Sequence, residues 1–476
     1  MFDVIIIGGG VVGGLLLREL SKYEMKVCLV EKEQDVCMGA SKANSGIVHA
    51  GFDAEPSSLK AKFNVQGNEM FPTLCEELGV KYRKNGSLVV SFSQEETATL
   101  YALKERGEKN GVKGLEILSQ ERLRSMEKNI AQTAQAALYA PTGGIVCPYE
   151  LTIASIGNAM DNGAELFTDF EVVSIQKQGE IFLVCSSVGQ QISGKIVVNC
   201  AGLASGKIAS LVGDTYITVN GRKGEYILLD RESGDLVGHT LFFTPTALGK
   251  GILVTQTVDN NILLGPTAEL VNDGNTETSG QGLSALIEKA RQMCPNLPLY
   301  NTITSFSGVR AYSNQKDFII EESRNEKGII HCAGIESPGL TSAPAIAKYV
   351  TETLIGNKIP LKKRPSFNPK RVASHAFKDL SIEEKNEWIA KDASYGKIVC
   401  RCEQITEGEI LCAIRQNPPA KDIDGVKRRT RSGMGRCQGG FCQPYIAELL
   451  AKERAIALEK VTKKGGQSNL LIGRTK

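Results

Sequence analysis

The chain has 476 residues, which is too long for one compact core, so two or three domains are expected. Hydrophobic residues make up 42% and charged residues 23%, as in an ordinary globular protein, and the net charge of +3 indicates neither a nucleic-acid binder nor an acidic tail. The apolar N-terminal run is broken by glycines and predicts neither a signal peptide nor a membrane span. We therefore expect a cytoplasmic protein, at most peripheral to the inner face of a membrane through a partner.

The N-terminal residues predict a dinucleotide-binding unit. Residues 2–7 form an apolar run typical of a buried strand, glycines follow at G-x-G-x-x-G spacing, and 11–22 reads as a helix. A second strand, 26–30, ends in an acid that can accept hydrogen bonds from ribose hydroxyls, and the glycines let a pyrophosphate approach the helix N-terminus. The alternative is a glycine-rich turn in an ordinary α/β domain. The candidate cofactor residues here are Gly8, Gly10, Gly13, Glu31 and Lys32.

The middle of the chain alternates helices and strands. A segment of small residues, 39–51, contains His49 and would let backbone amides approach a flat ligand. Residues 215–310 alternate short strands with Gly and Pro turns, which is typical of an antiparallel sheet that carries a substrate pocket. The other predicted elements are helices at 56–78, 93–110, 148–162 and 280–293 and strands at 87–92, 165–173, 182–185 and 196–200.

A third buried strand is predicted at 328–333, and a turn at 334–341 follows it. Thr341 is expected to cap a helix that continues to Leu354, with Pro344 tolerated in its first turn. Such a helix start presents backbone amides to an anionic ligand.

The thirteen cysteines are unevenly distributed. Eight are scattered among mostly apolar neighbours and are predicted to be buried side chains, whereas the other five lie close together in the C-terminal segment. Residues 360–369, which precede that segment, are basic and rich in proline and are predicted to be a connector. In a reducing compartment, this clustering indicates a metal site rather than disulfides. The basic run 427–436 is expected to form a charged face that could offset the charge of a cluster and guide an acceptor protein. The clustered cysteines are Cys400, Cys402, Cys412, Cys437 and Cys442.

Short motifs spread over about residues 1–355 carry a resemblance to a known family. They are the G-x-G-x-x-G turn at 8–13, the motif Ser41-x-x-Asn44-Ser45-Gly46-x-x-His49-x-Gly51, residues 198–202, the motif Ser307-Gly308-Val309-Arg310 and residues 334–341. Together they resemble the flavoprotein superfamily of D-amino-acid oxidase, sarcosine oxidase and glycerol-3-phosphate dehydrogenases, in which the nucleotide is FAD rather than NAD. The resemblance implies further FAD contacts from Ser41, Asn44, Ser45, Gly46, Val172, Ala201, Gly202, Gly334, Glu336, Gly339, Leu340 and Thr341.

The cysteine motifs Cys400-Arg401-Cys402 and Cys437-x-x-x-x-Cys442 resemble the small [2Fe–2S] domain of the bacterioferritin-associated ferredoxin type. Four thiolates suit a two-iron cluster, and the adjacent glycines offer backbone N–H groups to sulfur. The alternative is a structural zinc site, although such sites more often use C-x-x-C pairs. Cys412 lies in a helical stretch and is expected to serve packing.

These features together predict an α/β protein with three parts. A Rossmann-like FAD-binding domain is interleaved with an antiparallel-sheet substrate domain, and a small helical [2Fe–2S] domain lies at the C-terminus. The expected boundaries are 1–375 for the FAD-dependent part, 376–394 for a linker, 395–455 for the [2Fe–2S] domain and 456–476 for a tail. Within the FAD-dependent part, the nucleotide-binding segments are expected at about 1–75, 150–212 and 310–355, and the substrate segments at about 76–149 and 213–309.

The order of these domains resembles the large subunits of anaerobic glycerol-3-phosphate dehydrogenases. The resemblance implies a small anionic substrate, a second flavoprotein or iron–sulfur subunit as electron acceptor, and electron flow towards quinone or another acceptor. It implies His49 as the base, since imidazole titrates near neutrality, although this histidine could instead fix the loop or be joined covalently to FAD. Arg310 would clamp the anion and take part in catalysis, with contacts from Ser337 and Lys250.

Other functions stay open at this point. Arg310 could hold the carboxylate of a 2-hydroxy acid such as 2-hydroxyglutarate, and amine oxidation is a further choice. A protein of another class, an electron-transfer subunit whose flavin domain has no substrate of its own, would have no need of His49 and Arg310.

Overall fold

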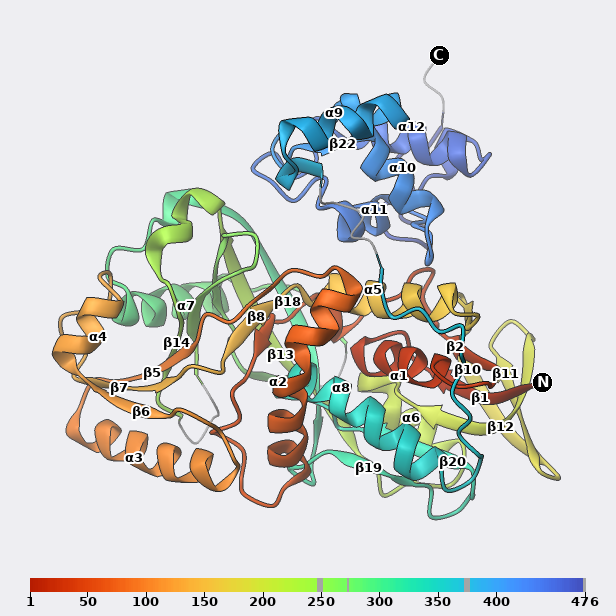
Figure 1. Ribbon diagram of the computed structural model, residues 1–476, viewed down its shortest axis with the longest axis horizontal. Coiled ribbons are helices and arrows are strands. Elements are labelled where there is room, and N and C mark those ends of the chain that lie inside the picture. Colours follow the sequence, from red (N-terminus) through yellow and green to blue (C-terminus); the bar gives the residue numbers. More distant parts are fainter. Residues whose placement is uncertain (246–250, 272–273, 372–376, 474–476) are drawn as a thin grey trace.

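The computed structural model describes residues 1–245, 251–271, 274–371 and 377–473. Figure 1 shows the chain folded into two sheet-containing parts and a small C-terminal domain. Two sheets lie side by side, and a small C-terminal domain lies over helix α5 (Pro148–Asp161). Within the described ranges, no helix has both the length and the apolar character that a membrane crossing needs.

The first sheet is built around strand β1 (Phe2–Ile7), whose central side chains are buried on both faces. Its neighbours β2 (Val27–Val30) and β12 (Gln191–Asn199) are both parallel to it, which confirms the predicted Rossmann-like unit. The carboxyl ends of these strands therefore meet at one edge, where the glycine turn leads into α1 (Val11–Ser21). The other elements here are β9 (Glu165–Phe167), β10 (Val172–Gln178), β11 (Ile181–Ser186), β19 (Ile319–Glu322), β20 (Ile329–Ala333), α6 (Ser205–Ser210) and α8 (Gly339–Tyr349).

The second sheet is centred on the long antiparallel pair β13 (Val219–Leu229) and β18 (Thr302–Ser313). It is antiparallel as predicted, except that β14 (Thr240–Phe243) runs parallel to β5 (Ser87–Ser91). Short strands β3 (Ile47–Val48), β8 (Gly144–Val146) and β4 (Tyr82–Arg83) form a separate small sheet. The remaining elements are β6 (Glu116–Ser119), β7 (Ala136–Ala140), β15 (Leu253–Gln256), β16 (Ile262–Gly265), β17 (Glu269–Val271), α2 (Leu59–Leu78), α3 (Gln94–Lys109), α4 (Gln120–Met126) and α7 (Gly280–Met293).

The prediction that Thr341 caps its helix is wrong, because α8 begins at Gly339 with Pro338 as the residue before it. Thr341 lies inside the first turn, fully buried, and its hydroxyl is engaged elsewhere. It accepts a hydrogen bond from the His49 backbone N–H at 2.9 Å and donates to the Ile47 carbonyl at 3.3 Å. Thr341 therefore ties α8 to the small-residue segment, and Pro344 lies beyond the first turn.

Helix α2 crosses α8 at a position where only glycine fits. A Cβ atom on Gly67 would lie 1.9 Å from the carbonyl oxygen of Thr341. Gly67→Ala should therefore push the helices apart and lower the free energy of unfolding by about 3 kcal/mol, seen as a lower thermal midpoint. Gly280→Ala is the matched control, because nothing lies within 4 Å of its Cβ position. Equal midpoints for both variants would contradict the tight crossing.

The connector 360–369 is fixed along the first sheet domain rather than loose. The Arg364 guanidinium donates to the carbonyls of Ser21, Tyr23 and Met25 at 3.1–3.2 Å. The Asn368 carbonyl accepts hydrogen bonds from the side chains of α5 residue Asn158 and of Asn162 just after it.

The expected linker 376–394 contains a helix in its described residues, α9 (Ile382–Lys391). Ser381 and Glu384 form a capping box that starts this helix. Trp388 packs edge-to-face on Tyr395 with ring centroids 4.8 Å apart, so the segment packs with the C-terminal domain. That domain is small and helical as predicted, and it comprises β21 (Ile398–Cys400), β22 (Ile405–Thr406), α10 (Glu407–Arg415), α11 (Ile423–Thr430) and α12 (Gln443–Glu453).

Candidate functional site

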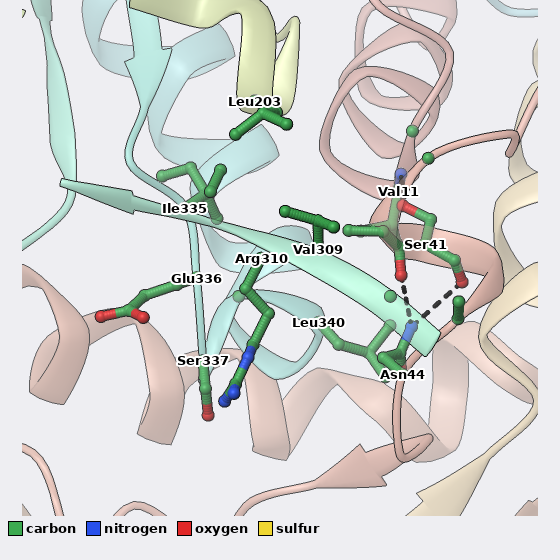
Figure 2. Close-up of a pocket in the computed structure, with 18 of the residues that line it drawn as sticks. Val11, Ser41, Asn44, Leu203, Val309, Arg310, Ile335, Glu336, Ser337 and Leu340 are labelled. Atoms are coloured by element: carbon green, nitrogen blue, oxygen red, sulfur yellow. Dashed lines mark hydrogen bonds between the residues drawn. The ribbon is translucent and has the colours of Figure 1, made fainter. Parts of the chain in front are cut away.

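A cavity of about 1420 Å³ extends from the glycine turn of the first sheet to β13 and β18 of the second. Figure 2 shows part of its wall, where residues from α1, the small-residue segment, β18 and the 335–340 turn face one space. It brings together predicted site residues that are far apart in sequence: Gly8, Gly10, Glu31, Lys32, Ser41, Asn44, Ser45, His49, Val172, Ala201, Gly202, Arg310, Glu336, Ser337, Gly339 and Leu340.

The remaining predicted residues are placed differently. Gly13, Gly46, Gly334 and Thr341 do not line the cavity but support its wall, and Lys250 lies outside the described residues. A Cβ on Gly13 would lie 2.1 Å from the Gly8 carbonyl oxygen, and one on Gly46 would lie 2.5 Å from that of Val146. These glycines therefore permit close backbone packing behind the cavity.

The glycine turn forms a cradle for a phosphate group. Gly8 has φ +112°, and a Cβ there would lie 2.5 Å from the Cys200 carbonyl oxygen. The Glu31 carboxylate accepts hydrogen bonds from the backbone N–H groups of Gly9 at 2.7 Å and Glu33 at 3.0 Å. Burial nevertheless raises the pKa of Glu31. The open turn, the adjacent acid and the side chains of residues 39–45, which are small except for Lys42, fit the adenosine diphosphate and flat ring of FAD.

His49, Ser337 and Arg310 meet at the other end of the cavity. His49 Nε2 lies 3.5 Å from Ser337 Oγ, and its backbone carbonyl accepts hydrogen bonds from the side chains of Asn64 and Asn68. Figure 2 shows the Arg310 guanidinium and the Ser337 hydroxyl pointing into the same space, whereas the Glu336 side chain points away.

The Arg310 side chain is only partly satisfied by protein atoms. Its Nη2 donates to the Thr267 carbonyl at 3.3 Å, while its buried Nε has no hydrogen-bond partner in the described residues. Buried donors of this kind are costly unless a ligand completes them, so this corner fits an anion.

The sequence reasoning missed several residues that line this cavity. Glu336 forms ion pairs with Lys60 at 2.9 Å and with Arg222 at 3.4 Å, and Arg222 lies directly opposite Arg310 in the β13–β18 register. Tyr226 Oη lies 3.5 Å from Ser45 Oγ. Arg222 and Tyr226 enter the cavity through the register of β13 with β18, and Lys60 enters it from α2 through its ion pair with Glu336. No local sequence pattern reveals contacts between residues so far apart in the chain. The missed residues are Lys60, Arg222, Tyr226 and Ser307.

The predicted ligand cysteines lie in two contacting pairs. Cys402 and Cys437 have their sulfur atoms 3.7 Å apart, and the Cys400 thiolate accepts a hydrogen bond from Cys442, which lowers the pKa of Cys400 to about 6. Burial would raise the pKa of Cys437, but backbone N–H groups at 439–441 lower it overall. Within the described ranges, no group of three or more His, Cys, Asp or Glu side chains is arranged around one metal ion. The two thiol pairs match a two-iron cluster, in which each iron takes two protein sulfur atoms.

The prediction that the basic run 427–436 forms a charged face holds only in part, because the Arg436 side chain is 56% exposed but three other arginines of the run are not. Arg428, Arg429 and Arg431 are buried, with 5–6% of their surface exposed, and they form ion pairs with acidic side chains. Arg431 binds Asp259 at 2.8 Å and Glu403 at 3.0 Å. These charges therefore hold the cysteine domain against the rest of the chain.

Comparisons with known proteins agree with this geometry. Residues 3–353 match the "FAD dependent oxidoreductase" family and 398–452 match the "BFD-like [2Fe-2S] binding domain". The chain is 48% identical to a glycerol 3-phosphate dehydrogenase of Caloramator mitchellensis, over 100% of this chain and 99% of that protein. It is 28% identical to human mitochondrial L-2-hydroxyglutarate dehydrogenase, over 74% and 88% of the respective chains.

Solved structures support the same assignment. The FAD-bound, dithionite-reduced L-alpha-glycerophosphate oxidase of Mycoplasma pneumoniae superposes with a TM-score of 0.74 at 31% identity, over 78% of this chain and 98% of that one. The nucleotide cradle, the oxidoreductase match and the paired cysteines account for FAD and a [2Fe–2S] cluster as the cofactors. The chain therefore belongs to the FAD-dependent oxidoreductase family and carries a BFD-like [2Fe–2S] binding domain at its C-terminal end.

Proposed function

We propose that this protein oxidises sn-glycerol 3-phosphate to dihydroxyacetone phosphate. The observation that carries the proposal is the meeting of His49, Ser337 and the unsatisfied Arg310 side chain in the cavity that begins at the glycine turn. The full-length similarity to a glycerol 3-phosphate dehydrogenase supports the same substrate.

Oxidation of a secondary alcohol requires a base for the hydroxyl proton and a fixed position for the C–H bond. When bound, FAD supplies the hydride acceptor and the [2Fe–2S] cluster a one-electron relay. His49 Nε2 takes the hydroxyl proton, and the hydrogen bonds to its backbone keep the imidazole in place. Arg310 holds the phosphate with its planar fork, and Ser337 contacts the substrate beside His49.

The cysteine domain supports electron delivery to a separate acceptor. Phe441, between the ligands Cys437 and Cys442, is 88% exposed, so the cluster loop reaches the surface. We propose a second flavoprotein, an iron–sulfur subunit or a quinone-linked protein as the acceptor, with any membrane association peripheral and through that partner.

Oxidation of a 2-hydroxy acid is the second candidate function. The Arg310 fork fits a carboxylate as well as a phosphate, and human L-2-hydroxyglutarate dehydrogenase is a relative. Anaerobic bleaching of the bound flavin by glycerol 3-phosphate, 2-hydroxyglutarate and amino acids separates the candidates. Rapid bleaching by glycerol 3-phosphate alone is the expected result, and bleaching only by 2-hydroxyglutarate would overturn the proposal.

Arg310→Met should raise the glycerol 3-phosphate concentration for half-maximal bleaching by about 10- to 150-fold, because a charge-assisted hydrogen bond is lost. Arg310→Lys keeps the positive charge but not the planar guanidinium, so it should raise this concentration by a smaller factor than Arg310→Met does. Arg222→Met is the matched control, since the guanidinium of Arg222 already binds Glu336. An equal loss in the Arg222 and Arg310 variants would contradict the assignment of the phosphate to Arg310.

A further inference from the structure

The loop that follows Glu31 is held from its outer side by the C-terminal domain. Asp35 in this loop is 3% exposed, and its carboxylate accepts hydrogen bonds from Arg429 Nη1 and Nη2, both at 2.8 Å, and from Arg428 Nη2 at 2.5 Å. Both arginines belong to α11 of the cysteine domain. Burial would raise the pKa of Asp35, but the paired guanidiniums hold it well below its usual value.

The inner side of the same loop is seated on the glycine turn. The Cys37 N–H donates to the Gly9 carbonyl at 2.8 Å, and the Val36 side chain lies 3.3 Å from the position of a Cβ on Gly9. The next residues, Met38 and Gly39, line the cavity. The adenosine end of a dinucleotide lies over this edge of a Rossmann-like sheet, beside the acid at the end of β2.

We propose that Asp35 is a positioning residue for FAD and that docking of α11 completes the FAD site. A buried carboxylate is stable only with its charged partners in place. When α11 leaves, Asp35 becomes hydrated and the loop loses its outer support, so Val36 and Cys37 no longer stay on the glycine turn. FAD binding and docking of the cysteine domain are therefore coupled, and the coupling acts equally in both directions.

The first test measures FAD affinity in the full-length protein from which FAD has been removed and in which the cluster is intact. Titration with FAD, followed by the quenching of its fluorescence, should give Kd values at least about tenfold higher for Arg429→Gln and Asp35→Asn than for the unsubstituted protein. Arg415→Gln is the matched control and should stay within twofold. It removes a bidentate arginine–carboxylate pair, with Glu453, that lies entirely inside the cysteine domain.

The second test measures the reciprocal effect by amide hydrogen exchange. Adding FAD to the unsubstituted protein should slow exchange in α11, and in Asp35→Asn the addition of FAD should leave α11 exchange unchanged. A general loss of stability would not remove this dependence on FAD. If Arg429→Gln does not fold, the FAD affinity of Asp35→Asn and the exchange measurement still test the proposal. The proposal is overturned if folded Asp35→Asn binds FAD as tightly as the unsubstituted protein does. It is also overturned if FAD does not change the exchange rate of α11 in the unsubstituted protein.

Discussion

His49→Gln should lower the rate of flavin bleaching by glycerol 3-phosphate by about 100- to 10,000-fold, the range that a general base usually contributes. Glutamine keeps a polar side chain of similar reach but does not take up a proton near neutral pH. The backbone contacts that hold residue 49 come from Thr341, Asn64 and Asn68 and do not depend on the imidazole. Anaerobic stopped-flow absorbance after mixing with substrate measures the rate.

The control for this variant is chemical reduction. Dithionite should reduce the flavin and the cluster of His49→Gln as completely as in the unsubstituted protein, since residue 49 lies in a different part of the chain from the cysteine site. Unchanged bleaching by the substrate would show that His49 only fixes its loop and that another group takes the proton.

Cys437→Ser should remove most of the iron from the protein and block electron transfer to the physiological acceptor, while substrate bleaching of the flavin stays largely intact. The unsubstituted protein, prepared anaerobically, should contain about two irons per chain. Cys437 and Cys402 form one of the two thiol pairs, so the substitution would leave one iron of a cluster held by these pairs with a single protein ligand. Metal analysis and reduction of an added acceptor are the two measurements.

Cys412→Ser is the matched control for the cysteine prediction, because Cys412 is a half-buried thiol on α10 of the same domain. It should retain both irons. Stoichiometric zinc without iron or sulfide would show that the cysteines form a structural zinc site. Loss of substrate bleaching in folded, FAD-loaded Cys437→Ser would contradict the separation of substrate oxidation from the cluster.

The parts of the fold that sequence reasoning predicted are those encoded by neighbouring residues. The strand–glycine–helix unit of β1 and α1 and the cysteine motifs each lie within a short stretch of chain. Their spacing reflects a local backbone requirement, such as the positive φ of Gly8, that any folded context must satisfy. The FAD family and the [2Fe–2S] domain predicted from them are confirmed.

The features that sequence reasoning missed depend on partners distant in the chain. Arg428 and Arg429 read as a charged surface because Asp35, which neutralises them, lies almost four hundred residues away. Arg222 enters the cavity through its register with β18, and Thr341 turns inward because its hydroxyl binds the segment around His49. The domain boundaries and the individual roles of the site residues stay predictions.

The connector has a consequence for how the two redox domains are joined. Residues 360–369 lie along the flavin domain. There the Pro369 carbonyl accepts a hydrogen bond from buried Arg18, and the Asn368 carbonyl accepts hydrogen bonds from the side chains of Asn158 and Asn162. The family match ends at 353, yet these buried polar side chains would each lose a hydrogen bond if the chain stopped there. Arg371 is also tied to the flavin domain, since its backbone N–H donates to the Glu77 carbonyl at 2.8 Å. The natural junction for domain exchange between relatives is therefore after Arg371, and a hybrid protein joined at that point keeps these contacts of the flavin domain.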